Sequence, residues 1–217
     1  MDRPRVAAII QARMGSTRLP GKVLLPLAGR PVLWHIIHRL RQCRTLDRIA
    51  VTTSDRPDDD VLVAWCETEG VPVFRGPEDN VLQRFAIAAE SLDPEVILRV
   101  TGDAPLIDPT VIDLLVNTLL REDADYCVGD SAHPTIHEGF SPFQRRALSR
   151  LLTDASRDPV AVEHVTAYLA CHPEQFSSCL CVLAGRAPVQ WSTRIRGHPD
   201  DLEVFEPFTA TSQLLAR

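Results

Sequence analysis

The sequence predicts a three-layer α/β domain with a mainly parallel central sheet. Short β-like runs alternate with longer segments of helical period over residues 1–129, a pattern typical of strand-helix-strand units. The length of 217 residues suits one domain rather than two. Apolar residues make up 45% of the chain, and a chain of this length buries a core that needs neither a metal nor a disulfide.

The first expected strand is the apolar run at 5–11, and similar runs follow it. Each is short and apolar or β-branched, with turn-forming residues nearby. In order, the expected strands are 5–11, 48–54, 72–74, 95–101 and 125–128, with two more near 176–183 and 188–195. Because helical segments separate the first five, we expect these strands to run parallel in one sheet.

Segments of helical period fill the intervals between these strands. The segment 31–43 carries an apolar stripe that includes Val32, Ile36 and Leu40. The segment 57–69 begins with Pro and three Asp, which suit the positive end of a helix dipole. The other expected helices are 80–92, 109–122, 144–154 and 160–171. After residue 129 the alternation breaks, so we expect one domain with two halves, 1–129 and 130–217.

Charge and hydropathy exclude two classes of protein. The formal net charge is -6, whereas a general nucleic-acid surface needs clustered Lys and Arg. The early apolar stretch Val6–Ile10 is too short for a signal-peptide core or a membrane span. We therefore expect a cytoplasmic protein with neither a nucleic-acid nor a membrane partner. The six cysteines form no C-x-x-C pair and are interpreted as reduced thiols.

The segment after the first strand, 12–22, combines two glycines, two hydroxyls and three cations. The cations are Arg13, Arg18 and Lys22, and Lys22 is the single lysine of the chain. Glycine permits close backbone approach, and Arg and Lys bind phosphate oxygens. Ligands of open α/β sheets bind at the carboxyl ends of strands. The loop therefore predicts a triphosphate cradle, with an ordinary basic surface loop as the alternative.

Two familiar phosphate-binding motifs do not fit this loop. A P-loop has four residues between its glycines and a Ser or Thr after the lysine. Here five residues separate Gly15 from Gly21, and Val23 follows Lys22. The dinucleotide fingerprint G-x-G-x-x-G does not occur in the chain, so NAD binding is disfavoured.

An aspartate at a second strand end is the predicted metal ligand. Asp103 follows the strand at 95–101. Magnesium prefers oxygen ligands and is usually shared between one or two carboxylates and substrate phosphates, so a carboxylate facing the loop at 12–22 suits Mg²⁺. A turn aspartate bonded to its own backbone is the alternative. Asp108, directly before a proline, is interpreted as a helix N-cap.

Several segments carry a resemblance to a known family. Residues 10–24, IQARMGSTRLPGKVL, and 29–33, GRPVL, closely resemble the opening of the spore coat polysaccharide cytidylyltransferases, relatives of the 3-deoxy-manno-octulosonate and acylneuraminate cytidylyltransferases. Further matches are 75–76 (RG), 80–85 (NVLQRF), 99–108 (RVTGDAPLID) and 163–166 (EHVT). The resemblance implies a nucleotide-diphospho-sugar transferase fold, which is GT-A-like and Rossmann-like. It also implies magnesium-dependent transfer of CMP from CTP to a sugar, with release of pyrophosphate.

The resemblance implies roles for individual residues. Arg13, Lys22 and Asp103 are the expected catalytic residues, with Asp103 as the Mg²⁺ ligand. The expected nucleotide-binding residues are Ala12, Arg13, Gly15, Ser16, Arg18, Lys22, Ser54, Gln83 and Asp103. The expected acceptor-binding residues are His164, which lies in a matching segment, and Arg194 and Arg196, which lie where the chain departs from the family and make the acceptor pocket basic. Residues 1–129 are then the nucleotide-binding half, and 130–217 the half for acceptor binding and dimerisation. The expected partners are CTP, a small sugar-like or phosphorylated acceptor and a second copy of the chain.

Two segments depart from the family pattern where it carries carboxylates. Residues 195–202 read IRGHPDDL where the family has V-D-T-P-x-D-L, and 139–144 read GFSPFQ where it has G-L-D-V-E-V. We favour retained transfer to a more anionic acceptor, with Arg194 and Arg196 replacing a cation, over nucleotide binding without efficient turnover. A nucleotide-sugar glycosyltransferase is a third interpretation, disfavoured because the D-x-D at 58–60 sits at an expected helix start.

Overall fold

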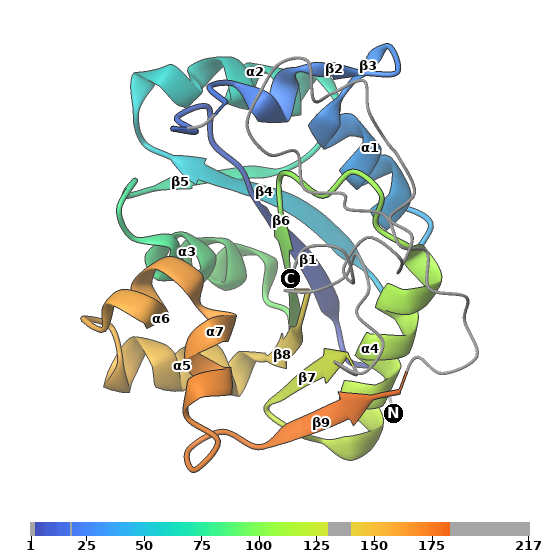
Figure 1. The fold of residues 1–217 in the computed structure, drawn as a ribbon, viewed down its shortest axis with the longest axis vertical. Helices are drawn as coiled ribbons and strands as arrows, with labels where there is room; N and C mark the ends of the chain where they lie inside the picture. Colours follow the sequence, from blue (N-terminus) through green and yellow to red (C-terminus); the bar gives the residue numbers. More distant parts are fainter. Residues whose placement is uncertain (1–2, 18, 130–139, 183–217) are drawn as a thin grey trace, which may run out of the picture.

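A seven-stranded mixed sheet forms the centre of the computed structural model, which describes residues 3–17, 19–129 and 140–182. Within these residues the strand order is β5-β4-β1-β6-β8-β7-β9 (Figure 1). The strands are β1 (Val6–Gln11), β4 (Arg48–Ser54), β5 (Val73–Gly76), β6 (Val96–Thr101), β7 (Tyr126–Gly129), β8 (Pro142–Gln144) and β9 (Ser178–Cys181). A separate hairpin of β2 (Pro26–Leu27) and β3 (Arg30–Pro31) follows the 3-10 turn at Lys22–Leu24.

Four neighbouring parallel strands, β5, β4, β1 and β6, set the position of the site. β1 pairs with β4 and β6, and β4 pairs with β5. At the end of β1, Gln11 lies opposite Thr52 of β4 and Thr101 of β6. The loops that leave these strands therefore meet at one edge of the sheet, where open α/β folds bind ligands. In Figure 1 this edge lies toward the top.

Helices cover both faces of the sheet and give three layers (Figure 1). The helices α1 (Val32–Leu40), α2 (Asp60–Thr68, preceded by the 3-10 turn Pro57–Asp59) and α4 (Pro109–Glu122) pack on one face. On the other face lie α3 (Val81–Leu92), α5 (Arg145–Asp154), α6 (Pro159–His164) and α7 (Thr166–Cys171). Alternate side chains of β1 enter the two cores, Ile10 the first and Ile9 the second, as expected for a strand buried on both faces. The predicted three-layer α/β fold with a mainly parallel sheet is confirmed.

The strand β8 does not follow from the sequence pattern. The pattern predicts a helix at 144–154 and no strand between residues 129 and 144. Instead Pro142–Gln144 pairs antiparallel with β6 and places Phe143 opposite Ile97. Both side chains are fully buried in the same core, so burial of an aromatic ring stabilises a strand too short to show a period.

The expected helix at 160–171 is divided into α6 and α7. The break is at Val165, whose φ is 47°. Positive φ is rare for a β-branched residue, and the Val165 side chain is fully buried in the core that α3 also lines. Packing of this side chain therefore overrides the helical period of the segment.

Some expectations about the fold are not settled by the described residues. The expected strand at 188–195 lies outside them, and the division into halves at residue 129 stays a prediction. Among the described helices, none combines the length and the apolar character that a bilayer crossing requires.

Candidate active site

The loop at 12–22 leaves the end of β1 and folds back around Met14. The Met14 carbonyl accepts hydrogen bonds from the N–H groups of Ser16 (2.9 Å) and Gly21 (2.8 Å). Gly21 has a φ of 71°, a conformation that glycine adopts without a steric penalty. The closed shape of the loop therefore depends on glycine at this position.

An ion pair between Lys22 and Asp103 joins the loops that follow β1 and β6. Lys22 Nζ donates to Asp103 Oδ2 over 2.7 Å, and the side chains are 19% and 21% exposed. Because both charges are partly shielded from water, they interact more strongly than a surface pair does. The structure thus brings together the lysine predicted to bind phosphate and the predicted metal ligand.

Close approach of these two loops depends on Gly102. Its N–H donates to the Gln11 carbonyl over 2.9 Å. A Cβ at this position would lie 3.0 Å from both the Gln11 carbonyl oxygen and the Ala12 Cβ. Glycine therefore lets the backbone before Asp103 pack directly on the end of β1.

Arg13 lies on the exposed rim of the site. Its Nη1 is 2.8 Å from Glu78 Oε1, and the two side chains are 43% and 42% exposed. Glu78 follows β5, and Arg56 Nε lies 3.7 Å from its other carboxylate oxygen. Exposed pairs of this kind contribute little to stability. A bound phosphate can therefore replace Glu78 as the partner of the Arg13 guanidinium at small energetic cost.

Asp59 is a buried carboxylate that the sequence placed only at a helix start. It is 1% exposed, and its Oδ1 accepts the Met14 N–H over 2.7 Å. Its Oδ2 accepts Thr53 Oγ1 (2.8 Å), the Ser54 N–H (3.0 Å) and the Ser54 hydroxyl. Burial alone would raise the pKa of Asp59, but these hydrogen bonds outweigh burial and lower it. A charged Asp59 therefore ties the loop at 12–22 to the end of β4.

A buried arginine fixes the loop after β5, whose Glu78 pairs with Arg13. Arg84 of α3 is 2% exposed, and its Nη1 donates to the carbonyls of Pro77 and Glu78, each over 2.7 Å. Burial and the charge of Arg13 lower the pKa of Arg84, while Asp59 and Glu78 oppose this change. The loop after β5 is therefore fixed by a cation from the helix that follows it.

Four other predicted nucleotide-binding residues lie near the same sheet edge. Ala12 is buried, and Ser16 is half-buried in the loop. Ser54 is buried at the end of β4, where its hydroxyl donates to Asp59. Gln83 is exposed in the first turn of α3. Their contacts with a nucleotide stay predictions.

The described residues include only one of the three predicted acceptor-binding residues. His164 is exposed at the end of α6, which packs on α3 and α7. In the described part of the chain it makes no hydrogen bond or ion pair with the loop at 12–22. Arg194 and Arg196, like Arg18 of the loop at 12–22, lie outside the described residues.

Asp103 suits a divalent cation that is shared with a substrate. The Lys22 ammonium 2.7 Å from its carboxylate shows that a cation fits there. Residues 3–17, 19–129 and 140–182 contain no cluster of three or more His, Cys, Asp and Glu able to hold a metal. Magnesium often binds through one or two carboxylates plus substrate phosphates and waters. The residues present therefore fit Mg²⁺ brought with a nucleotide better than a cage made by protein alone.

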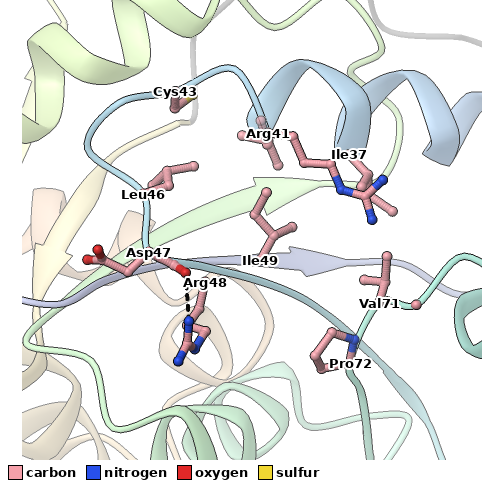
Figure 2. A pocket seen from close by; sticks show the side chains of 11 residues that line it. Ile37, Arg41, Cys43, Leu46, Asp47, Arg48, Ile49, Val71 and Pro72 are labelled. Carbon is pink, nitrogen blue, oxygen red and sulfur yellow. Dashed lines mark hydrogen bonds between the residues drawn. The ribbon is translucent and has the colours of Figure 1, made fainter.

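A pocket of about 310 Å³ lies at the opposite end of β4, where α1 and the segment before β5 supply apolar side chains (Figure 2). Arg41 Nη2 donates to the Glu69 carbonyl, and Arg48 Nη1 donates to the Asp47 carbonyl, each over 3.2 Å. None of the predicted site residues lines this pocket. It is therefore not the candidate active site.

Comparison with known proteins decides the family. A model of the cytidylyltransferase family matches residues 7–199, a span that includes the loop at 12–22 and Asp103. The chain belongs to the cytidylyltransferase family. The resemblance carried by the loop motif is thereby confirmed, and the match extends into the half that follows residue 129.

Curated relatives of this family member agree with that placement. The spore coat polysaccharide biosynthesis protein SpsF of Bacillus subtilis is 39% identical over 173 residues, which cover 76% of this chain and 70% of the relative. A 3-deoxy-manno-octulosonate cytidylyltransferase of Anaeromyxobacter is 41% identical over 118 residues, 53% of this chain and 47% of that enzyme. The chain is thus similar to a spore coat polysaccharide biosynthesis protein and to a 3-deoxy-manno-octulosonate cytidylyltransferase, the two kinds of relative that the sequence motifs indicated.

Solved structures with a similar fold confirm the predicted nucleotide-diphospho-sugar transferase fold. A cytidylyltransferase from Leptospira borgpetersenii matches with a TM-score of 0.75 and 31% identity, covering 82% of this chain and 76% of that chain. CMP:2-keto-3-deoxy-manno-octonic acid synthetase complexed with CTP matches with a TM-score of 0.63 and 17% identity, over 84% and 92%. Rv0371c of Mycobacterium tuberculosis in complex with manganese matches with a TM-score of 0.61 and 17% identity, over 91% and 95%. The last two matches show a shared fold.

Proposed function

We propose that the chain transfers CMP from CTP to a small anionic acceptor, sugar-like or phosphorylated, and releases pyrophosphate. The observation that carries the proposal is the 2.7 Å ion pair of Lys22 and Asp103 at the edge where the β1 and β6 loops meet. The lysine suits a phosphate and the aspartate suits a divalent cation, and a nucleoside triphosphate with its magnesium requires both. Membership of the cytidylyltransferase family supports cytidine as the base.

The loop after β1 supplies the groups that hold the triphosphate. Lys22 and Arg13 bind the β- and γ-phosphates, and Arg18 is proposed to join them. Within the described residues, the N–H groups of Gly15 and Thr17 donate to no protein acceptor. Such backbone donors can bind phosphate oxygens without a change of side chain.

The proposed reaction is a displacement at the α-phosphorus of CTP. An oxygen of the acceptor forms a bond to this phosphorus, the bond to the oxygen that bridges the α- and β-phosphates breaks, and pyrophosphate leaves. The proton of the acceptor passes to solvent. Lys22 and Arg13 stabilise the charge on the departing pyrophosphate, so that catalysis is mainly positional and electrostatic. A magnesium ion held by Asp103 would supply further charge neutralisation at the phosphate oxygens.

The remaining predicted residues complete the proposed site. Ala12, Ser16, Ser54 and Gln83 are assigned to the nucleotide. The acceptor-binding residues are His164, Arg194 and Arg196, and the two arginines favour an anionic acceptor. A homodimer in the cytoplasm is part of the same proposal.

One observation favours a second candidate function, nucleotide binding without efficient turnover. In the family pattern, the segment that corresponds to 139–144 contains two acidic residues, and the second of them occupies the position of Phe143. The Phe143 ring is fully buried in the core, so this position supplies neither a metal ligand nor a contact to the acceptor.

Pyrophosphate release from CTP tests the two functions against each other. We expect release that requires both Mg²⁺ and an anionic acceptor, measured over a panel of neutral sugars, sugar acids and sugar phosphates. The Lys22→Met variant keeps the apolar stem without the charge and should lose release. Tight CTP binding with no release for any acceptor would support the second function, and no binding of CTP would contradict both. Light scattering of the same sample tests the dimer.

A further inference from the structure

We propose that Asp59 is a positioning residue that holds the phosphate-binding loop in the shape that receives CTP. The inference rests on the proposed function, because it takes the loop at 12–22 to bind the triphosphate. Asp59 belongs to the turn that precedes α2, and its side chain accepts hydrogen bonds from Met14, Thr53 and Ser54. Its effect on the nucleotide passes through the backbone of Met14.

Met14 is the point about which the loop closes. Its carbonyl accepts the N–H groups of Ser16 and Gly21 over 2.9 and 2.8 Å, and its own N–H donates to Asp59 Oδ1 over 2.7 Å. The Asp59 side chain thus attaches the closed turn to the body of the protein at Met14. Gly15, next to this attachment, supplies one of the backbone donors assigned to phosphate.

The other oxygen of Asp59 anchors this attachment to the sheet. Oδ2 accepts the hydroxyls of Thr53 and Ser54 and the Ser54 N–H at the end of β4. A carboxylate accepts hydrogen bonds at both of its oxygens, so Asp59 satisfies donors from two directions at once. Because Asp59 is 1% exposed, water cannot replace a bond that is lost.

An asparagine at this position satisfies only one of the two directions. Its single amide oxygen can accept from Thr53 and Ser54, where three donors converge. Its NH₂ group then faces the Met14 N–H, and two donors cannot bond to each other. Asp59→Asn is therefore expected to release the loop at 12–22 while β4 keeps its anchor.

Neighbouring aspartates do not share this role and provide a control. Asp58 is exposed in the same turn and Asp60 is exposed at the start of α2, where Asp60 pairs with Arg75 Nη1 over 2.6 Å on the surface. Asp58→Asn removes the same charge from the same helix start without touching Met14. It controls for the general effect of charge near the bound nucleotide.

Calorimetric titration of CTP with Mg²⁺ into the folded proteins is the first test. We expect Asp59→Asn to bind roughly 10- to 100-fold more weakly than the parent, in line with the cost of a small misplacement at a binding site. Asp58→Asn should stay within about twofold of the parent. A folded Asp59→Asn protein with parental affinity would overturn the proposal. A purely structural role lowers the melting temperature without changing the affinity of the folded fraction.

Amide hydrogen exchange in the parent protein is the second test and needs no variant. The Met14 N–H should exchange more slowly than the adjacent Gly15 N–H, because it donates to a buried carboxylate. Equal exchange rates at the two positions would overturn the proposal even if Asp59→Asn did not fold. A parent protein that fails to bind CTP contradicts the proposed function, whereas the exchange result still decides how Asp59 holds the loop.

Discussion

Replacing Asp103 with asparagine should separate nucleotide binding from metal binding. In the free protein Lys22 Nζ lies 2.7 Å from Asp103 Oδ2, and both side chains are about four-fifths buried. A hydrogen bond between charged groups in this setting contributes about 1.5 kcal/mol. Without a metal, the triphosphate of CTP must replace Asp103 as the partner of Lys22, and it is then repelled by the negative charge of the Asp103 carboxylate. Asp103→Asn removes this competition, so metal-free CTP should bind about tenfold more tightly, since about 1.4 kcal/mol corresponds to a factor of ten.

Calorimetric titrations with EDTA and with Mg²⁺ provide the assay for this prediction. In the parent, Mg²⁺ should strengthen CTP binding, and in Asp103→Asn it should have little effect. Lys22→Met is the matched comparison, because it removes the other charge of the pair and should weaken CTP binding under both conditions. If Asp103→Asn lowers metal-free affinity, or still responds fully to Mg²⁺, the assigned roles of the pair are wrong.

Two further predictions concern stability. Gly102→Ala should lower the free energy of unfolding by about 1–3 kcal/mol in urea titrations, because the added Cβ would meet the Gln11 carbonyl oxygen at 3.0 Å. In Gly15→Ala the added Cβ would lie 3.5 Å from its nearest neighbour, so this variant should lose less of the free energy of unfolding. Equal losses in the two variants would contradict the packing argument. Burial raises the pKa of Asp125, but hydrogen bonds from Arg146 and from a serine before β9 outweigh burial and hold the pKa below its ordinary value. The carboxylate therefore stabilises the fold above the ordinary pKa of an aspartate, and this contribution is lost as the pH falls through the lower pKa of the folded state. Urea titrations between about pH 5 and pH 2 should therefore show a steeper loss of stability in the parent than in Asp125→Asn, and parallel curves would contradict the assignment.

The sequence predicted the two charges of the site because each follows a strand in a recognisable way. Lys22 is the single lysine of the chain and lies in a glycine-containing loop, and Asp103 follows a strand that begins with the apolar run at 96–98. Parallel strands bring such ends to one edge, so their proximity follows from the fold class. The 2.7 Å ion pair shows that they meet.

The role of Asp59 was not predictable because three consecutive aspartates suit a helix start equally well. A signal was present, since β4 ends in Thr53 and Ser54, whose hydroxyls can donate to a carboxylate. The choice among the three required knowledge of which one is buried, and burial is decided by how α2 packs. The same reason explains β8 and the break at Val165, where long-range packing of Phe143 and Val165 overrides local periodicity.

Crystals grown with CTP and Mn²⁺ test the central claim most directly, since the anomalous signal of manganese locates the ion independently of the nucleotide. We predict an anomalous peak in direct contact with the Asp103 carboxylate, triphosphate oxygens on the same ion, and Lys22 turned from Asp103 to the phosphates. A nucleotide bound elsewhere, or an ion that makes no contact with Asp103, would contradict the account.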